Sequence, residues 1–197
     1  ARLTFLESQM VEYKEARGGD FAQVLVEKLM ASKTGGNRSL AWQASPPPLY
    51  QEGIKVQTPW LYQFLLEPGK IRYTTVLRMP KFNMSKQEAR TLANYFAAVD
   101  GAQFPYQEQI ATDTDYVDGR QAALVAEGVL KPDQKYLSEC WSLLNGPLCV
   151  KCHSVGGRKF KVSDPAKDIQ GPNLNVVQNR LRSDWVKLWL YKPTWIT

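Results

Sequence analysis

The sequence has little of what many sites and partners require. It contains one histidine, His153, which excludes most sites built from several imidazoles and leaves His153 as the only residue for any mechanism that needs one. No apolar stretch approaches the roughly 18 residues of a membrane span, so no transmembrane segment is predicted. The net charge of +6 is compatible with an acidic protein partner, an anionic membrane surface or nucleic acid, but Lys and Arg form no basic run, which argues against the nucleic-acid partner.

Aromatic residues are plentiful by contrast. The 197 residues include six Trp, nine Tyr and seven Phe, more than a minimal core needs. Such a composition suits a fold that wraps a large flat apolar object, and it also suits an ordinary aromatic-rich core. The length allows one large domain or two small ones.

Helical periodicity and breaker residues predict an all-α fold of short helices joined by long irregular loops. The clearest helix start is the capping box of Ser85 and Glu88, which opens a helix over 85–99. Further helices are predicted for two segments of 1–34 (the second from Asp20), and for 60–66, 121–130, 134–144 and 183–193. Loops are predicted at 41–59, which is rich in proline, and at 71–84, 102–120 and 156–171.

An internal repeat relates residues 47–71 to residues 172–196 at a constant offset of 125 positions, without gaps. We call these segments the first and second copies. Phe64 against Trp189 keeps an aromatic ring at an equivalent position. The identical pairs are Pro47 and Pro172, Leu49 and Leu174, Trp60 and Trp185, Leu65 and Leu190, Pro68 and Pro193, and Ile71 and Ile196.

Cys149-Val150-Lys151-Cys152-His153 is the Cys-x-x-Cys-His motif of c-type haem attachment. Two thiols on one helical turn can reach the two vinyl groups of a porphyrin, and the next residue then directs its imidazole at the iron. A thioredoxin-like redox pair would need a surrounding βαβ pattern, which is missing. Half of a zinc site would need further ligands, and only Cys140 remains.

With these flanks the chain resembles the cytochrome c family of mono-haem domains over residues 46–99 and 134–196. A helix precedes the motif, and Gly171-Pro172-Asn173-Leu174 follows it at the family's spacing. The resemblance implies one haem c with His153 as proximal iron ligand, its second ring nitrogen bonded to the Pro172 carbonyl. It implies Met79, in the Arg78-Met79-Pro80 segment, as the sixth ligand, and an extracytoplasmic location such as the periplasm.

The order of the parts departs from the family, because the Met-Pro segment precedes the haem motif. In one interpretation the halves complement each other and Met79 ligates this haem, as in a circular permutant. In the other, the chain is a section of a longer tandem di-haem protein, and Met79 serves another haem. The counterpart of Met79 would then lie beyond Thr197. The abrupt end of the chain favours this second interpretation, whereas the presence of one attachment motif, one histidine and one Met-Pro segment favours the first. Met84 is a weaker ligand candidate because no proline follows it.

The predicted organisation has four parts: an N-terminal helical segment (1–45), the Met-ligand half of a cytochrome c-like domain (46–100), a linker with a short helix (101–133) and the haem-attachment half (134–197). The predicted function is electron transfer to or from a redox partner, without enzyme activity of its own. One alternative is a haem module of a larger redox complex with other cytochrome subunits. The other is a haem enzyme or gas-binding site with an open sixth position.

Overall fold

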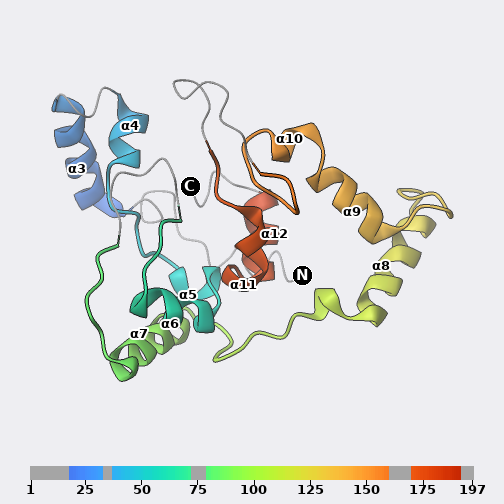
Figure 1. The fold of residues 1–197 in the computed structure, drawn as a ribbon, viewed down its shortest axis with the longest axis horizontal. Coiled ribbons are helices and arrows are strands. Elements are labelled where there is room, and N and C mark those ends of the chain that lie inside the picture. The colour runs from blue at the N-terminus through green and yellow to red at the C-terminus, as the bar shows by residue number, and fades with distance from the viewer. Residues whose placement is uncertain (1–17, 33–36, 72–78, 160–169, 192–197) are drawn as a thin grey trace. The chain divides into compact units, whose positions relative to one another are not determined.

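The computed structural model describes residues 18–32, 37–71, 79–159 and 170–191 (Figure 1). These residues are mostly helical, and their extended pairings are two isolated β-bridges, which confirms the all-α class for this part of the chain. The helices are α3 (Gly19–Ala31), α4 (Arg38–Gln43), α5 (Glu52–Lys55), α6 (Thr58–Leu66), α7 (Lys86–Val99), α8 (Thr114–Ala126), α9 (Tyr136–Leu144), α10 (Pro147–Val150), α11 (Val177–Arg180) and α12 (Ser183–Tyr191), with 3₁₀ turns η1 (Ile110–Thr112) and η2 (Leu174–Val176).

The chain divides into two compact units. Among the described residues, unit 1 comprises 18–70, 79–107 and 178–191, and unit 2 comprises 71, 108–159 and 170–177. The second copy is therefore shared: its Gly-Pro-Asn-Leu segment belongs to unit 2, whereas α12 belongs to unit 1.

Unit 1 has an apolar core in which α7 packs on α5 and α6. The side of α7 that faces this core carries small residues, Ala89, Ala93 and Ala97, all of them buried. Small side chains let the helices approach closely, and Val56, Leu61 and Leu65 complete the buried cluster. The burial of these apolar side chains is the main source of stability in unit 1.

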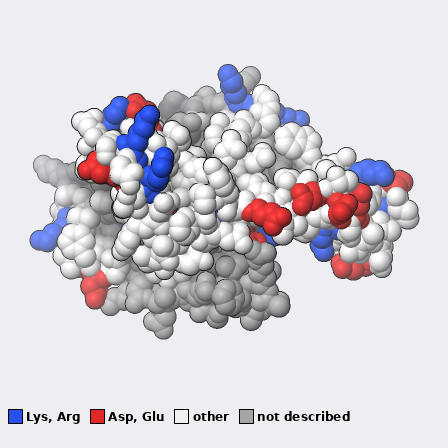
Figure 2. Space-filling model, turned by 90° about the horizontal axis from the view of Figure 1, so that it is seen from below, with Lys and Arg blue, Asp and Glu red and all other residues white. Residues whose placement is uncertain are grey.

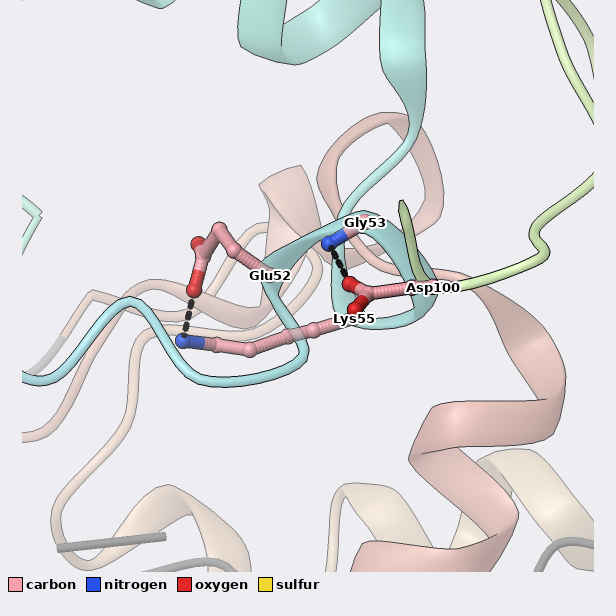
Figure 3. Close-up of polar contacts among 4 residues, drawn as sticks. All are labelled: Glu52, Gly53, Lys55 and Asp100. Carbon is pink, nitrogen blue, oxygen red and sulfur yellow. Dashed lines mark hydrogen bonds and ion pairs between the residues drawn. The ribbon is translucent and has the colours of Figure 1, made fainter. Parts of the chain in front are cut away.

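The crossing of α5 and α7 depends on Gly53. A Cβ atom there would lie 2.0 Å from the carbonyl oxygen of Phe96, so the backbones of the two helices are in direct contact. Asp100 follows α7 and accepts a hydrogen bond of 2.7 Å from the Gly53 N–H, while Lys55 pairs with Glu52 at 2.8 Å (Figure 3). Burial raises the pKa of the Asp100 carboxyl above its usual value, and the hydrogen bond from Gly53 opposes that rise.

Most predicted helices are present, and the capping box is confirmed. The Glu88 N–H donates to Ser85 Oγ at 3.2 Å, and the Ser85 N–H donates to a Glu88 carboxylate oxygen at 2.8 Å. The Ser85 hydroxyl also donates to this carboxylate oxygen at 2.8 Å, and the two bonds that the carboxylate accepts, first the one from the Ser85 N–H, hold the pKa of the Glu88 carboxyl below its usual value. The first predicted helix of 1–34, and the ends expected at Gly35 and Pro193, lie outside the described residues.

Two loop predictions were wrong in part. The Pro-rich segment 41–59 contains α5, which has four residues, too few for periodicity to reveal. The segment 102–120 contains η1 and the first turns of α8, which begins at Thr114. Gly119 lies within α8, and a glycine within a helix costs only about 1 kcal/mol relative to alanine, so the helix continues through it.

The repeat reappears in the element boundaries. α5 and α6 span 52–55 and 58–66, and α11 and α12 span 177–180 and 183–191, so each pair is separated by the offset of 125 found in the sequence. An extended residue stands between the two helices in both copies. Pro193 and Ile196 of the second copy lie outside the described residues.

Unit 2 is held together differently. Gln121 of α8 joins its helix to α9, because its amide donates to the Gln134 carbonyl and accepts from the Tyr136 N–H, both at 2.7 Å. Burial, and next the neighbouring Cys140 thiol, raise the pKa of the Tyr136 hydroxyl. Among the described residues of unit 2, Val155 is the one buried hydrophobic side chain, so this part of the chain has almost no protein core.

Candidate cofactor site

The Cys-x-x-Cys-His motif lies on α10 and the turn that continues it. Pro147 occupies the first turn of α10, where a missing N–H costs nothing. The N–H groups of Cys152 and His153 donate to the Cys149 carbonyl at 3.3 and 3.0 Å, so the motif forms one compact turn. Cys149 and His153 are half-buried and Cys152 is exposed, and both thiols are free of disulfides.

The imidazole of His153 is fixed through one nitrogen. Its Nδ1 lies 2.6 Å from the carbonyl oxygen of Pro172, the contact that the family resemblance implies. A carbonyl oxygen can only accept, so Nδ1 must carry the proton and Nε2 then presents a lone pair. A neutral imidazole with its second nitrogen held in this way is the form in which histidine binds metals.

Two backbone hydrogen bonds hold the Gly-Pro-Asn-Leu segment beside the motif. The Gly171 N–H donates to the Cys152 carbonyl at 2.8 Å, and the Leu174 N–H donates to the Ser154 carbonyl at 2.9 Å. Gly171 also lies flat against the histidine ring, since a Cβ there would be 2.5 Å from Cε1 of His153. The loop between His153 and Gly171 therefore places a residue without a side chain against the imidazole ring.

A second loop contact supports the same region. The side-chain amide of Asn175 accepts from the Gly156 N–H at 2.7 Å and donates to the Gly156 carbonyl at 3.1 Å. Gly156 has a φ of 58°, the left-handed region that favours glycine, and its Cα faces the Trp141 ring of α9. Helix α9 is thereby joined to the loop that follows the motif.

Apolar side chains of α9 remain uncovered next to this site. Trp141 is 52% exposed, Leu137 58% and Leu143 75%, so these apolar side chains of α9 are open to solvent. A porphyrin is a flat apolar object that would cover such surface. The thiol pair, the oriented imidazole and the missing protein core of unit 2 together fit a covalently attached haem.

Met79 lies in unit 1, whereas Cys149, Cys152, His153 and Pro172 lie in unit 2. The half-buried Met79 side chain packs on the apolar cluster of unit 1, as does Met84. The structure therefore brings four of the five predicted residues together, and Met79 as an iron ligand stays a prediction.

Charge on unit 2 is uneven. Acidic side chains gather over α8 and the loop after it, as Figure 2 shows. Lys151, Arg158 and Lys159 are exposed on and after the motif.

We expect Gly171→Ala to disturb the site without unfolding the chain. The added methyl group would collide with the imidazole, a side chain that can turn away, so the cost falls on the orientation of the ring. A misaligned imidazole loses its bond to Pro172 and binds iron less strongly. In the haem-loaded protein, acid titration followed by visible absorption should show loss of the histidine ligand at a higher pH than in the unaltered chain.

Gly157→Ala is the matched control, since nothing lies within 4 Å of the Cβ it would add and its φ is not in the left-handed region. Equal acid midpoints for Gly171→Ala and Gly157→Ala would contradict a role for the bare backbone at residue 171.

Sequence reasoning missed Gly171, Gly156 and Asn175 as contributors to the site. Gly171 was part of a recognised motif, but its contact with the ring is a tertiary feature. Only the glycines themselves signalled a special backbone position, and glycine is common in loops.

Comparison with family models, with curated proteins and with solved structures gives no match for this chain. Within the described ranges, no group of three or more His, Cys, Asp or Glu side chains is arranged to hold a metal ion. None of the helices in that part of the chain combines the length and apolar character that a membrane crossing requires.

Proposed function

We propose that the protein is a c-type cytochrome that binds one haem through Cys149, Cys152 and His153 and transfers single electrons. The observation that carries the proposal is the His153 ring, held at Nδ1 by the Pro172 carbonyl and directly preceded by a correctly spaced thiol pair. A zinc or redox-disulfide site would not account for that combination as simply.

The chain's own residues have distinct tasks in this proposal. The two thiols hold the macrocycle, and Nε2 of His153 supplies the proximal ligand while Pro172 fixes the ring. A bound haem would supply the Fe(II)/Fe(III) couple for the transfer of single electrons.

The direct test is acid–acetone extraction of protein matured in an extracytoplasmic compartment, the location that we propose. Covalent attachment predicts that the colour stays with the protein and that intact mass shows one added haem. Colour that moves into the solvent would refute the proposal.

The sixth ligand is proposed to be Met79. A thioether ligand stabilises Fe(II), so Met79→Ala should lower the reduction potential and remove the weak far-red absorption of sulfur-ligated ferric haem. Met30→Ala, which removes a more exposed methionine from α3, is the control and should leave the spectrum unchanged. An unchanged spectrum in Met79→Ala would assign the sixth ligand to another residue or another chain.

A second function is favoured by one observation. Met79 already packs on the cluster of unit 1, a sufficient structural role for a methionine side chain. An open sixth position would then make the protein a haem enzyme or a gas-binding module. Carbon monoxide decides between the two, since it binds ferrous haem rapidly only where no strong sixth ligand competes.

The proposed physiological partner is a redox protein with an acidic surface, with other cytochrome subunits as further partners. The exposed Lys151, Arg158 and Lys159 support this choice, because opposite charge accelerates the encounter of two proteins. Electron transfer to such a partner should slow as salt concentration rises.

A further inference from the structure

The two copies of the repeat touch each other at equivalent residues. Val56 and Leu181, which are 125 positions apart, form an antiparallel β-bridge. Beside it the Gln57 N–H donates to the Arg180 carbonyl at 2.8 Å. If a local two-fold axis related the two copies, each residue could be exchanged for its equivalent 125 positions away. The bond from the N–H of residue 57 to the carbonyl of residue 180 would then have a counterpart from the N–H of residue 182 to the carbonyl of residue 55.

That second bond is present. The Arg182 N–H donates to the Lys55 carbonyl at 3.0 Å. Side chains follow the same rule: Gln57 Nε2 donates to the Leu181 carbonyl at 3.0 Å, and Arg182 Nε donates to the Val56 carbonyl at 2.9 Å. Four hydrogen bonds thus form two reciprocal pairs about the bridge.

Cations and aromatic rings repeat the pattern. The Arg180 guanidinium lies 5.1 Å from the centre of the Trp60 ring, and Lys55 Nζ lies 6.0 Å from the Trp185 ring. Each ring stacks on an aromatic side chain four residues further along its own helix, Trp60 on Phe64 and Trp185 on Trp189. In both copies the basic residue that directly precedes the bridge residue therefore forms a cation–π contact with a tryptophan of the other copy.

One position breaks the symmetry in a useful way. Gln57 and Arg182 are equivalent, but only Arg182 is charged, and it is 4% exposed. Its guanidinium also donates to Thr58 Oγ1 at 3.0 Å. An arginine at both positions would bring two buried positive charges close to the axis, which is costly. The contact therefore favours pairing of a first copy with a second copy over pairing of two second copies.

We propose that these contacts are a docking interface between the two copies of the repeat. In this interface residues 178–191 of the second copy recognise residues 52–66 of the first copy in the same chain. Residues 24–28, which are equivalent to 149–153 at the offset of 125, contain neither cysteine nor histidine. The partner of the haem-attachment copy is thus a copy without an attachment motif of its own. In Figure 1 α12 lies beside α5, and the two helices are in contact. The contacts that form this interface involve none of Cys149, Cys152 and His153, so the proposal does not rest on haem attachment.

The bridge itself supplies a test in the full-length chain. The hydrogen bonds flank Val56 and Leu181 instead of joining them, the arrangement in which Cα atoms are about 4.5 Å apart. That distance lies within the range of a disulfide. Val56→Cys/Leu181→Cys should oxidise in air to a disulfide within one chain, identified by peptide mass spectrometry. The control is Gln63→Cys/Leu181→Cys, because Gln63 is exposed on α6 away from the bridge, and it should remain reduced.

A disulfide between two chains would assign the partner copy to another molecule, and a reduced pair would show that the copies do not meet; either outcome overturns the proposal. The unaltered protein gives an independent measurement if the variant fails to fold. The N–H groups of Gln57 and Arg182 both bond across the copies, so both should exchange with deuterium at least about tenfold more slowly than in an unfolded chain. Rapid exchange at both amides would also overturn the proposal.

Discussion

Replacement of both Cys149 and Cys152 by alanine should abolish covalent haem attachment completely. The chain has three cysteines, and the remaining one, Cys140, lies on α9 without a second thiol or a following histidine at the required spacing. Because a thioether cannot form without a thiol, no partial attachment is expected. Unit 2 should also lose stability, since the apolar side chains of α9 would then remain in contact with water.

Haem staining of a denaturing gel measures this loss, because only covalently held haem stays with the chain. Cys140→Ala is the matched control: it removes one thiol outside the motif and should retain the full signal. Retention of stain in the double variant would place the attachment site elsewhere and would remove the basis for the proposed function.

Gly53→Ala should destabilise unit 1 by about 3 kcal/mol, at the upper end of the usual cost of overpacking. The added Cβ would meet three backbone atoms of α7, with distances of 2.0 and 2.5 Å to the carbonyl oxygen and carbon of Phe96 and 2.8 Å to the Ala97 nitrogen. Backbone atoms cannot turn aside as a side chain can, so α5 must move away from α7. The hydrogen bond from the Gly53 N–H to Asp100 would be strained at the same time.

Urea unfolding followed by far-ultraviolet circular dichroism would reveal the change as a lower midpoint of the transition. Gly69→Ala is the control within the same unit, since nothing lies within 4 Å of its Cβ position, and it should be neutral or slightly stabilising. Equal midpoints for the two variants would mean that α5 and α7 are not in backbone contact.

Local signals in the sequence predicted local structure well. The capping box at Ser85 and Glu88 required only neighbouring residues, and α7 begins where the box places it. The pairing of His153 with Pro172 was predicted from the resemblance, because that contact depends on the length of the loop between the two residues and not on periodicity. The repeat was visible as an alignment, and the helix boundaries of both copies agree with it.

Contacts between distant segments were not predictable in the same way. Gly53 resembles any loop glycine until α7 is placed against it. The bridge between Val56 and Leu181 joins residues that are equally apolar in many other pairings. Met79 has a ligand-like sequence context and a core-like position, and the sequence context favoured the ligand role over core packing.

Covalent linkage changes what the docking of the two copies requires energetically. The contact includes one bridge, six hydrogen bonds and two cation–π pairs, a small set of contacts compared with a typical interface between separate molecules. Within one chain, the tether keeps the local concentration of each copy for the other on the order of millimolar, so a weak contact is still occupied. Because the two copies do not need to bind each other tightly, equivalent positions could acquire different residues, as Gln57 and Arg182 illustrate. Duplication would thus have turned a concentration-dependent encounter into a fixed internal joint.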